Sequence, residues 1–141
     1  MTVYAETSAV LAWLFGEPAG NRVKEALDAA ARVVSSALTP VEAGRTVERA
    51  ESQALISSAD AAKLRGLIAR NTSQWTLLEI GPTVRLRAGQ AFPVEPVRTL
   101  DALHLASALE FLVLFPDLKV LSLDDRVLAN LPPLGLATEG P

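Results

Sequence analysis

Short apolar runs alternate along the chain with longer segments in which apolar residues recur at helical spacing. The short runs predict strands at residues 3–5, 32–36, 75–80 and 118–121, with a last edge strand at 134–137. The longer segments predict helices at residues 7–15, 18–31, 39–55, 58–70, 83–91 and 99–115, followed by a short helix that starts at 124.

Three of these helix starts carry a local signal. Pro18 suits the first position of a helix, because a backbone N–H at that position has no partner within the helix and proline lacks one. Thr39, Pro40 and Glu42 form a capping-box pattern, which predicts Thr39 as the N-cap and Glu42 in the first turn. Thr99 is the predicted cap of the long apolar helix.

The alternation of strands and helices predicts the fold class. It is α/β, with a central, mainly parallel sheet covered by helices on both faces and a helical hairpin over residues 39–72. The chain has 141 residues, which fits a single domain over residues 1–141. We see no internal repeat, linker or low-complexity segment.

Composition narrows the chemistry. Half of the residues are hydrophobic and only 21% are charged, so the chain can fill a core. The absence of cysteine excludes disulfides, zinc–thiolate sites and cysteine nucleophiles. The single histidine, His104, is the only one on which a serine–histidine hydrolase could rely, and we interpret it as a packed helix residue.

Charge and hydropathy bear on partners and location. No apolar run reaches the length of about 20 residues that a membrane span needs, and the first residues lack a basic signal region, so we expect a cytoplasmic protein with no membrane partner. The net charge of −3 lacks the basic footprint of most nucleic-acid binders. A nucleic-acid activity would therefore have to bring its own cation.

Four acidic residues stand apart from those on polar helix faces. Glu6 and Asp124 follow predicted strands, and Glu42 and Asp101 lie at predicted helix starts. In a parallel α/β sheet these positions gather at one edge, so all four can converge on one crevice. Clustered carboxylates repel one another, and Mg²⁺ or Mn²⁺ would remove that repulsion because these ions prefer carboxylate oxygen.

Each acid also has a simpler interpretation. Helix N-termini favour acids, so Glu42 and Asp101 could serve the helix dipole and Asp124 could be an N-cap. Glu6 ends a strand and has no capping alternative as good. Asp125 could replace or supplement Asp124 if the strand ends one residue later.

Four blocks of the sequence carry a family resemblance. They are YAETSAVL at 4–11, PVE at 40–42, TLDALHLASA at 99–108 and LSLD at 121–124. In order and spacing they resemble the signature blocks of PIN-domain nucleases, most closely those of VapC-like toxins. The DALHLA run is the most specific of them, and the spacing of the last block favours Asp124 over Asp125.

The resemblance implies a PIN-like three-layer α/β/α sandwich and acidic metal-site roles for Glu6, Glu42, Asp101 and Asp124. The implied cofactor is Mg²⁺ (or Mn²⁺), and the Thr7 and Ser8 hydroxyls would orient the first acid. The family usually has aspartate where this chain has Glu6, which keeps the charge and adds one methylene.

The resemblance also implies a function and partners. The chain would be a metal-dependent endoribonuclease, the toxin of a type II toxin–antitoxin pair, which hydrolyses RNA phosphodiester bonds. A cognate antitoxin would lay its C-terminal segment across the active-site groove and push a basic side chain towards the acids. The resemblance also implies a homodimer, because members of the family commonly form one. The candidate surfaces are the helix around Leu11, Trp13 and Leu14 and the helical hairpin.

Three other interpretations remain. A DNA-directed metal nuclease would use the same acids, and a catalytically weak PIN-like binding module would follow if Glu6 spoiled the metal site. A response-receiver-like domain needs a lysine late in the chain, but Lys119 lies at the start of its predicted strand, which is the wrong end. Arg98 and Arg126 flank acids and could neutralise them.

Overall fold

The structure, a computed structural model, describes residues 1–140. Within them, five strands form one sheet in the order β3-β2-β1-β4-β5, and every neighbouring pair is parallel. The strands are β1 (Thr2–Ala5), β2 (Arg32–Ser36), β3 (Thr76–Leu78), β4 (Lys119–Leu121) and β5 (Ala137–Thr138). The predicted α/β class with a mainly parallel sheet is confirmed, and β2 has the predicted bounds.

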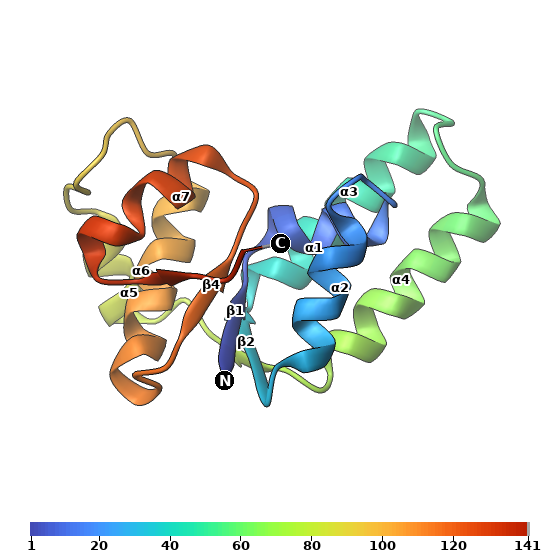
Figure 1. Ribbon diagram of the computed structural model, residues 1–141. Coiled ribbons are helices and arrows are strands. Elements are labelled where there is room, and N and C mark those ends of the chain that lie inside the picture. The colour runs from blue at the N-terminus through green and yellow to red at the C-terminus, as the bar shows by residue number, and fades with distance from the viewer. Residues whose placement is uncertain (141) are drawn as a thin grey trace.

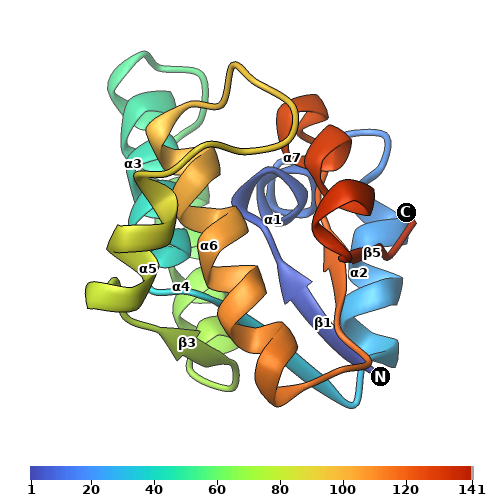
Figure 2. The ribbon, with the colours of Figure 1, turned by 90° about the vertical axis from the view of Figure 1, so that its left-hand side faces the viewer.

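Helices cover both faces of this sheet. They are α1 (Thr7–Leu14), α2 (Gly20–Ala29), α3 (Leu38–Ser52), α4 (Ser58–Thr72), α5 (Pro82–Ala88), α6 (Thr99–Leu114), α7 (Asp125–Asn130) and the 3-10 helix η1 (Pro132–Leu134). Figure 1 shows α1–α4 on one side of the strands and α5–α7 on the other, with α3 and α4 as the predicted hairpin. Figure 2 looks onto the second helical layer, with α5 and α6 in front of the sheet.

The central strand divides its side chains between two cores. Val3 and Ala5 of β1 pack with α1–α4, whereas Tyr4 faces the opposite way and packs with α6 and α7. All three side chains are fully buried. Successive strand residues point to opposite faces, so a strand covered on both sides reads as a continuous apolar run.

The start of the second helix differs from the prediction. Pro18 does not open it, because Pro18 and Ala19 lie in a turn and α2 begins at Gly20. A Cβ on Gly20 would lie 2.5 Å from the Ala12 carbonyl oxygen of α1. This close approach of two helix backbones requires glycine, and tertiary packing therefore sets the helix boundary.

The capping predictions for Thr39 and Thr99 are also wrong. α3 begins at Leu38, whose N–H donates to Ser36 Oγ at 3.1 Å, so Thr39 is already inside the helix and Glu42 lies beyond its first turn. The N-cap of α6 is Arg98, with no side-chain capping bond. Asp101 does lie in the first turn of α6, as predicted.

The parallel topology places the site at one edge of the sheet. The carboxyl ends of β1, β2 and β4 lie at the same edge, and each is followed within a few residues by the start of a helix. Side chains distant in sequence are thereby brought together there. None of the described helices is long and apolar enough to cross a membrane.

Candidate acidic active site

The four predicted acids line one cavity at the carboxyl edge of the sheet. Its volume is about 370 Å³, and its walls include Glu6, Glu42, Asp101 and Asp124. Two residues of α1, the N-cap of α6 and one residue within α6 also line the cavity; they are Thr7, Ser8, Arg98 and His104. Asp125, the alternative to Asp124, is exposed and does not line the cavity.

Glu6 enters the cavity from the end of β1. It is buried, and Oε2 accepts hydrogen bonds from Ser122 Oγ at 2.9 Å, from the Ser8 N–H at 3.1 Å and from the Ser8 hydroxyl. The expectation that Glu6 has no capping alternative as good as those of the other acids is wrong, because the bond from the Ser8 N–H makes Glu6 the N-cap of α1. All of these bonds fall on one oxygen, so within residues 1–140 Oε1 is left to the cavity.

Glu42 enters from α3 and is held by its Oε1 atom. Thr7 Oγ1 donates to it at 2.8 Å, and His104 Nε2 lies 2.6 Å away. Thr39 stands behind Thr7, with its hydroxyl 3.2 Å from Thr7 Oγ1 and 2.8 Å from Ser35 Oγ. This buried hydroxyl chain is where the Thr39 side chain goes in place of capping the helix.

Asp101 and Asp124 share one guanidinium. Arg98 Nε donates to Asp101 Oδ2 at 3.0 Å, and Arg98 Nη2 donates to Asp124 Oδ2 at 3.0 Å. The bond to Asp101 and the charges of Asp101, Asp124 and Glu6 raise the pKa of Arg98. Asp124 also caps α7 through Oδ1, which accepts from the Arg126 and Val127 N–H groups. Neutralisation by Arg98 thus matches the sequence interpretation.

The donor set suits a hard divalent cation. Four carboxylates face the cavity against one guanidinium, and carboxylate oxygen is the ligand that Mg²⁺ and Mn²⁺ prefer. In residues 1–140, however, no group of three histidine or acidic side chains already surrounds a cation position. In this structure Arg98 pairs with both Asp101 and Asp124, so a guanidinium occupies two of the carboxylates that would hold the ion. The chemistry of the four carboxylates fits a hard divalent cation.

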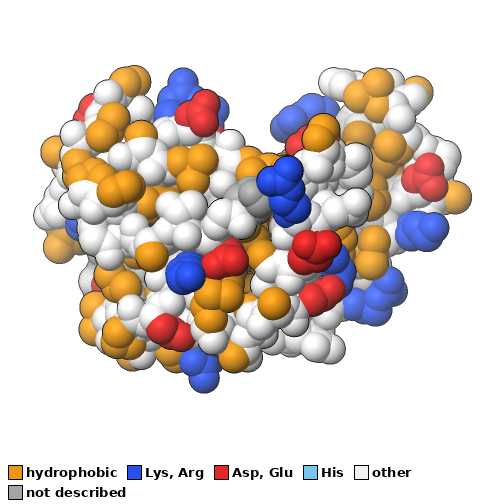
Figure 3. All heavy atoms as spheres, viewed as in Figure 1, with side chains coloured by type: hydrophobic (Ala, Val, Ile, Leu, Met, Phe, Trp, Pro, Cys, Tyr) orange, Lys and Arg blue, Asp and Glu red, His pale blue; other side chains and the backbone are white. Residues whose placement is uncertain are grey.

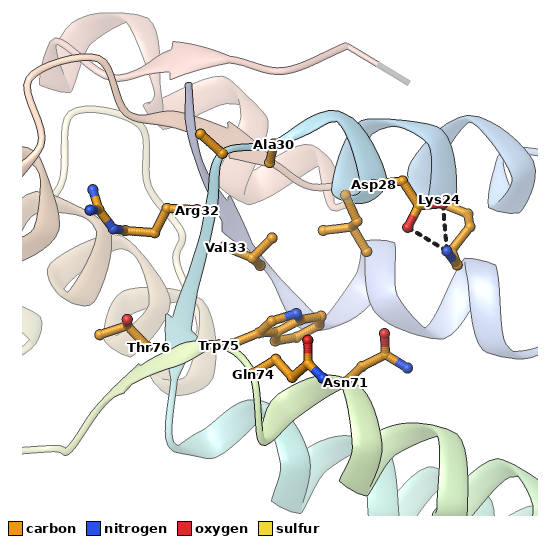
Figure 4. Close-up of a pocket in the computed structure, with 11 residues that line it drawn as sticks. Lys24, Asp28, Ala30, Arg32, Val33, Asn71, Gln74, Trp75 and Thr76 are labelled. Atoms are coloured by element: carbon orange, nitrogen blue, oxygen red, sulfur yellow. Dashed lines mark hydrogen bonds and ion pairs between the residues drawn. The ribbon is translucent and has the colours of Figure 1, made fainter.

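A second hollow, of about 460 Å³, lies at the opposite end of the sheet, where β2 and β3 begin. Figure 4 shows Trp75 on its wall, with Asn71 and Gln74 beside the ring. Its acid, Asp28, is paired with Lys24, and the Arg32 guanidinium stacks over the Phe115 ring. One paired acid does not make a carboxylate cluster, so this hollow offers no chemistry comparable to that of the acid-lined cavity.

The space-filling view agrees with the modest net charge. In Figure 3, acidic and basic side chains are interspersed over the visible face, with no continuous basic patch. The face shown therefore offers no broad electrostatic attraction for a polyanion.

Sequence reasoning missed three contributors to this site. His104 is buried, as expected for a packed helix residue, but both ring nitrogens are hydrogen-bonded and one touches Glu42. Tyr4 and Ser122 were named only within the family blocks at 4–11 and 121–124, with no role of their own, yet Tyr4 contacts His104 and Ser122 holds Glu6. Their polar atoms in an apolar strand were the available signal, because buried polar groups need partners.

Fold and site together define a three-layer α/β domain with an acid-lined cavity at the carboxyl edge of a parallel sheet. The chain belongs to the PIN-domain family, because the model of the PIN domain matches residues 3–131. Members of this family are nucleases and generally depend on metal ions. No curated protein matches the sequence significantly.

Solved structures share the fold at low sequence identity. VapBC from Salmonella typhimurium, solved bound to DNA, matches with a TM-score of 0.67 and 17% identity over 99% of this chain and 97% of that one. VapBC-1 from nontypeable Haemophilus influenzae matches with a TM-score of 0.66 and 13% identity over 99% of this chain and 97% of that one. VapBC2 from Rickettsia felis, solved bound to a DNA fragment from their promoter, matches with a TM-score of 0.65 and 10% identity over 99% of this chain and 98% of that one.

Proposed function

We propose that residues 1–141 form one PIN domain that acts as a metal-dependent endoribonuclease, the VapC-like toxin of a toxin–antitoxin pair. The observation that carries the proposal is the convergence of Glu6, Glu42, Asp101 and Asp124 on one cavity. Family membership supports the nuclease activity. The DALHLA block and the fold shared with VapBC structures support the toxin branch.

The carboxylates are held in ways that leave ligand atoms available. Glu6 is anchored by Ser8 and Ser122 through Oε2, and Glu42 by Thr7 and His104 through Oε1. No fully buried side-chain oxygen in the described chain lacks a partner, so the other oxygen of each acid reaches open space. Anchored acids with one accessible oxygen are suited to holding a cation in a fixed position.

A divalent cation held there would supply an activated water for in-line attack and neutralise charge that develops on the phosphate. Asp101 and Asp124 must first release Arg98, whose side chain is 62% exposed and can swing outward. Once released, Arg98 remains at the rim of the cavity. Its five donors could then bind a flanking phosphate.

We propose a protein partner for the same groove. The antitoxin expected from the family resemblance would place a basic side chain beside the acids, and Arg98 shows that these acids accept a guanidinium. A partner's basic group would thus compete with the cation for Asp101 and Asp124, which accounts for inhibition in electrostatic terms.

We also propose that the chain forms a homodimer. Of the two surfaces first considered, α1 and the helical hairpin, α1 is a poor one, because Leu14 is buried and Leu11 and Trp13 pack against the core. Exposed apolar side chains lie instead on α5 and α6, where Leu86 and Val113 line a shallow apolar hollow of about 490 Å³. A second copy packed on this face would cover both side chains.

A cleavage assay tests the function. The purified chain is given single-stranded RNA and DNA of one sequence, with Mg²⁺, with Mn²⁺ and with EDTA. We expect cleavage of RNA that needs the metal. Asp101→Asn should lower the rate on the order of a hundredfold or more, because a metal ligand contributes several kcal/mol to the transition state. The matched control Asp125→Asn alters an exposed neighbouring acid outside the cavity and should leave the rate unchanged.

The other outcomes separate the alternatives. Cleavage of DNA alone would identify a DNA-directed nuclease. Absence of cleavage at any metal concentration would indicate a weak binding module, the interpretation favoured if Arg98 holds the acids permanently. Cleavage that continues in EDTA would refute the metal-dependent proposal.

A further inference from the structure

The only histidine and the only tyrosine of the chain touch each other beneath the acidic cavity. Tyr4 is fully buried and His104 is 2% exposed. The Tyr4 hydroxyl lies 2.8 Å from His104 Nδ1, and the two rings meet edge to face with centroids 6.0 Å apart. Packing and a hydrogen bond therefore fix the orientation of the imidazole.

The opposite ring nitrogen of His104 faces the site. Nε2 lies 2.6 Å from Glu42 Oε1 and 3.2 Å from Thr7 Oγ1. An ionised carboxylate can only accept hydrogen bonds, so Nε2 must carry a proton. Thr7 donates to the same Glu42 oxygen at 2.8 Å. Oε1 is thus held by two donors, and within residues 1–140 Oε2 makes no hydrogen bond that would turn it away from the cavity.

The hydrogen bonds have a definite direction. With the proton on Nε2 in a neutral imidazole, Nδ1 is an acceptor and the Tyr4 hydroxyl donates to it. Burial, and after it the charge of Glu6, raises the pKa of Tyr4, so the phenol keeps its proton. The chain of donors therefore runs from Tyr4 through His104 to Glu42.

We propose that His104, oriented by Tyr4, is a positioning residue that holds Oε1 of Glu42 so that Oε2 faces the cation. The proposal rests on the proposed function of the cavity. It explains why α6 carries Asp101 and His104 three residues apart, on one helix face. One helix then supplies an acid directly and fixes the acid that comes from α3.

The first test measures the tautomer in the metal-free protein labelled with ¹⁵N at histidine. Because His104 is the only histidine, its ring signals need no assignment. We expect a proton on Nε2 and none on Nδ1. A proton on Nδ1, alone or together with Nε2, would overturn the proposal. Tyr4→Phe removes only the hydroxyl that donates to Nδ1, so the ¹⁵N signal of Nδ1 should shift while the proton stays on Nε2; an unchanged Nδ1 signal would overturn the role of Tyr4.

The second test compares two amides at position 104 by the binding of Mn²⁺ alone, followed by electron paramagnetic resonance. His104→Gln places a donor near the position of Nε2, whereas His104→Asn reaches only the position of Nδ1. The asparagine variant should bind Mn²⁺ about 10- to 100-fold more weakly than the wild type, and the glutamine variant within about threefold of it. Their melting temperatures should be similar, because both lose the ring.

Equal weakening in both variants, in step with their melting temperatures, would reduce His104 to a structural role and overturn the proposal. A wild type that binds no Mn²⁺, or that binds it no better than Asp101→Asn, would instead overturn the proposed function and the positioning with it. The two failures are distinguishable because only the second appears without any change at His104. The tautomer measurement needs no variant, so it decides the proposal even if neither amide variant folds.

Discussion

Ser122→Ala isolates one bond that holds the first acid. Ser122 is buried just after β4; its hydroxyl donates to Glu6 Oε2 at 2.9 Å and accepts from the Asp124 N–H at 3.1 Å. Ser36 makes a matching contact at the end of β2, where its hydroxyl accepts from the Leu38 N–H at 3.1 Å. The two serines therefore differ chiefly in the bond to the carboxylate, and Ser36→Ala is a matched control.

The magnitude follows from that difference. A hydrogen bond to a charged group contributes about 1.5–3 kcal/mol, and a bond from a backbone N–H about 1 kcal/mol. Both variants lose a backbone bond, so Ser122→Ala should lower the free energy of unfolding by about 2 kcal/mol more than Ser36→Ala. For a chain of this length, that corresponds to a difference in melting temperature of about 8 °C.

Denaturant and thermal unfolding in EDTA measure this difference, because the chelator removes any stabilisation by bound metal. With Mn²⁺ present, Ser122→Ala should also bind the ion about 10- to 100-fold more weakly, since Glu6 has lost one of its anchors. Free energies of unfolding that agree within about 0.5 kcal/mol for the two variants would refute the reasoning. So would unchanged Mn²⁺ affinity in Ser122→Ala.

Three further predictions follow from the same contacts. Arg98→Ala removes the guanidinium shared by Asp101 and Asp124 and should tighten Mn²⁺ binding in calorimetry; weaker binding would contradict the competition. Glu6→Asp keeps the charge and a preferred capping residue, so RNA cleavage should persist, and its complete loss would contradict the ligand role. Burial raises the pKa of Tyr4 above its unfolded value near 10, so the stability associated with its neutral form is present below about pH 10 and is lost as the pH rises further. The phenolate absorbance of this single tyrosine should therefore appear only with alkaline unfolding; a titration near pH 10 in the folded protein would refute the buried geometry.

Much of the architecture was predictable because it depends on local pattern. The run Val3-Tyr4-Ala5 is apolar throughout, as a strand covered on both faces must be, and residues 32–36 form β2 as predicted. Parallel strands need crossover helices, so the alternation of apolar strand runs with segments of helical periodicity was sufficient to predict the fold class. Because the acids lie at predicted strand ends and helix starts, the sequence also predicted that they meet at one edge of the sheet.

The errors lie where contacts between distant segments override local preference. Pro18 and Thr39 carry good helix-start signals, but the approach of Gly20 to Ala12 and the bond from Leu38 to Ser36 move the boundaries. Glu6 was expected to have no capping alternative as good as those of the other acids, because it ends a strand; in the structure it caps α1. Each outcome depends on a partner that periodicity does not reveal.

The sequence by itself determined the order of elements, the burial of the strands and the edge at which the acids meet, because these follow from side-chain period and parallel connection. Only the tertiary structure decided which oxygen of each acid is held and by what. His104 faces Glu42 across 62 positions, and Ser122 faces Glu6 across 116. Such contacts depend on side-chain direction and distance in the packed chain. A donor and an acceptor far apart in the sequence come within hydrogen-bond distance only when the strands and helices that carry them pack together.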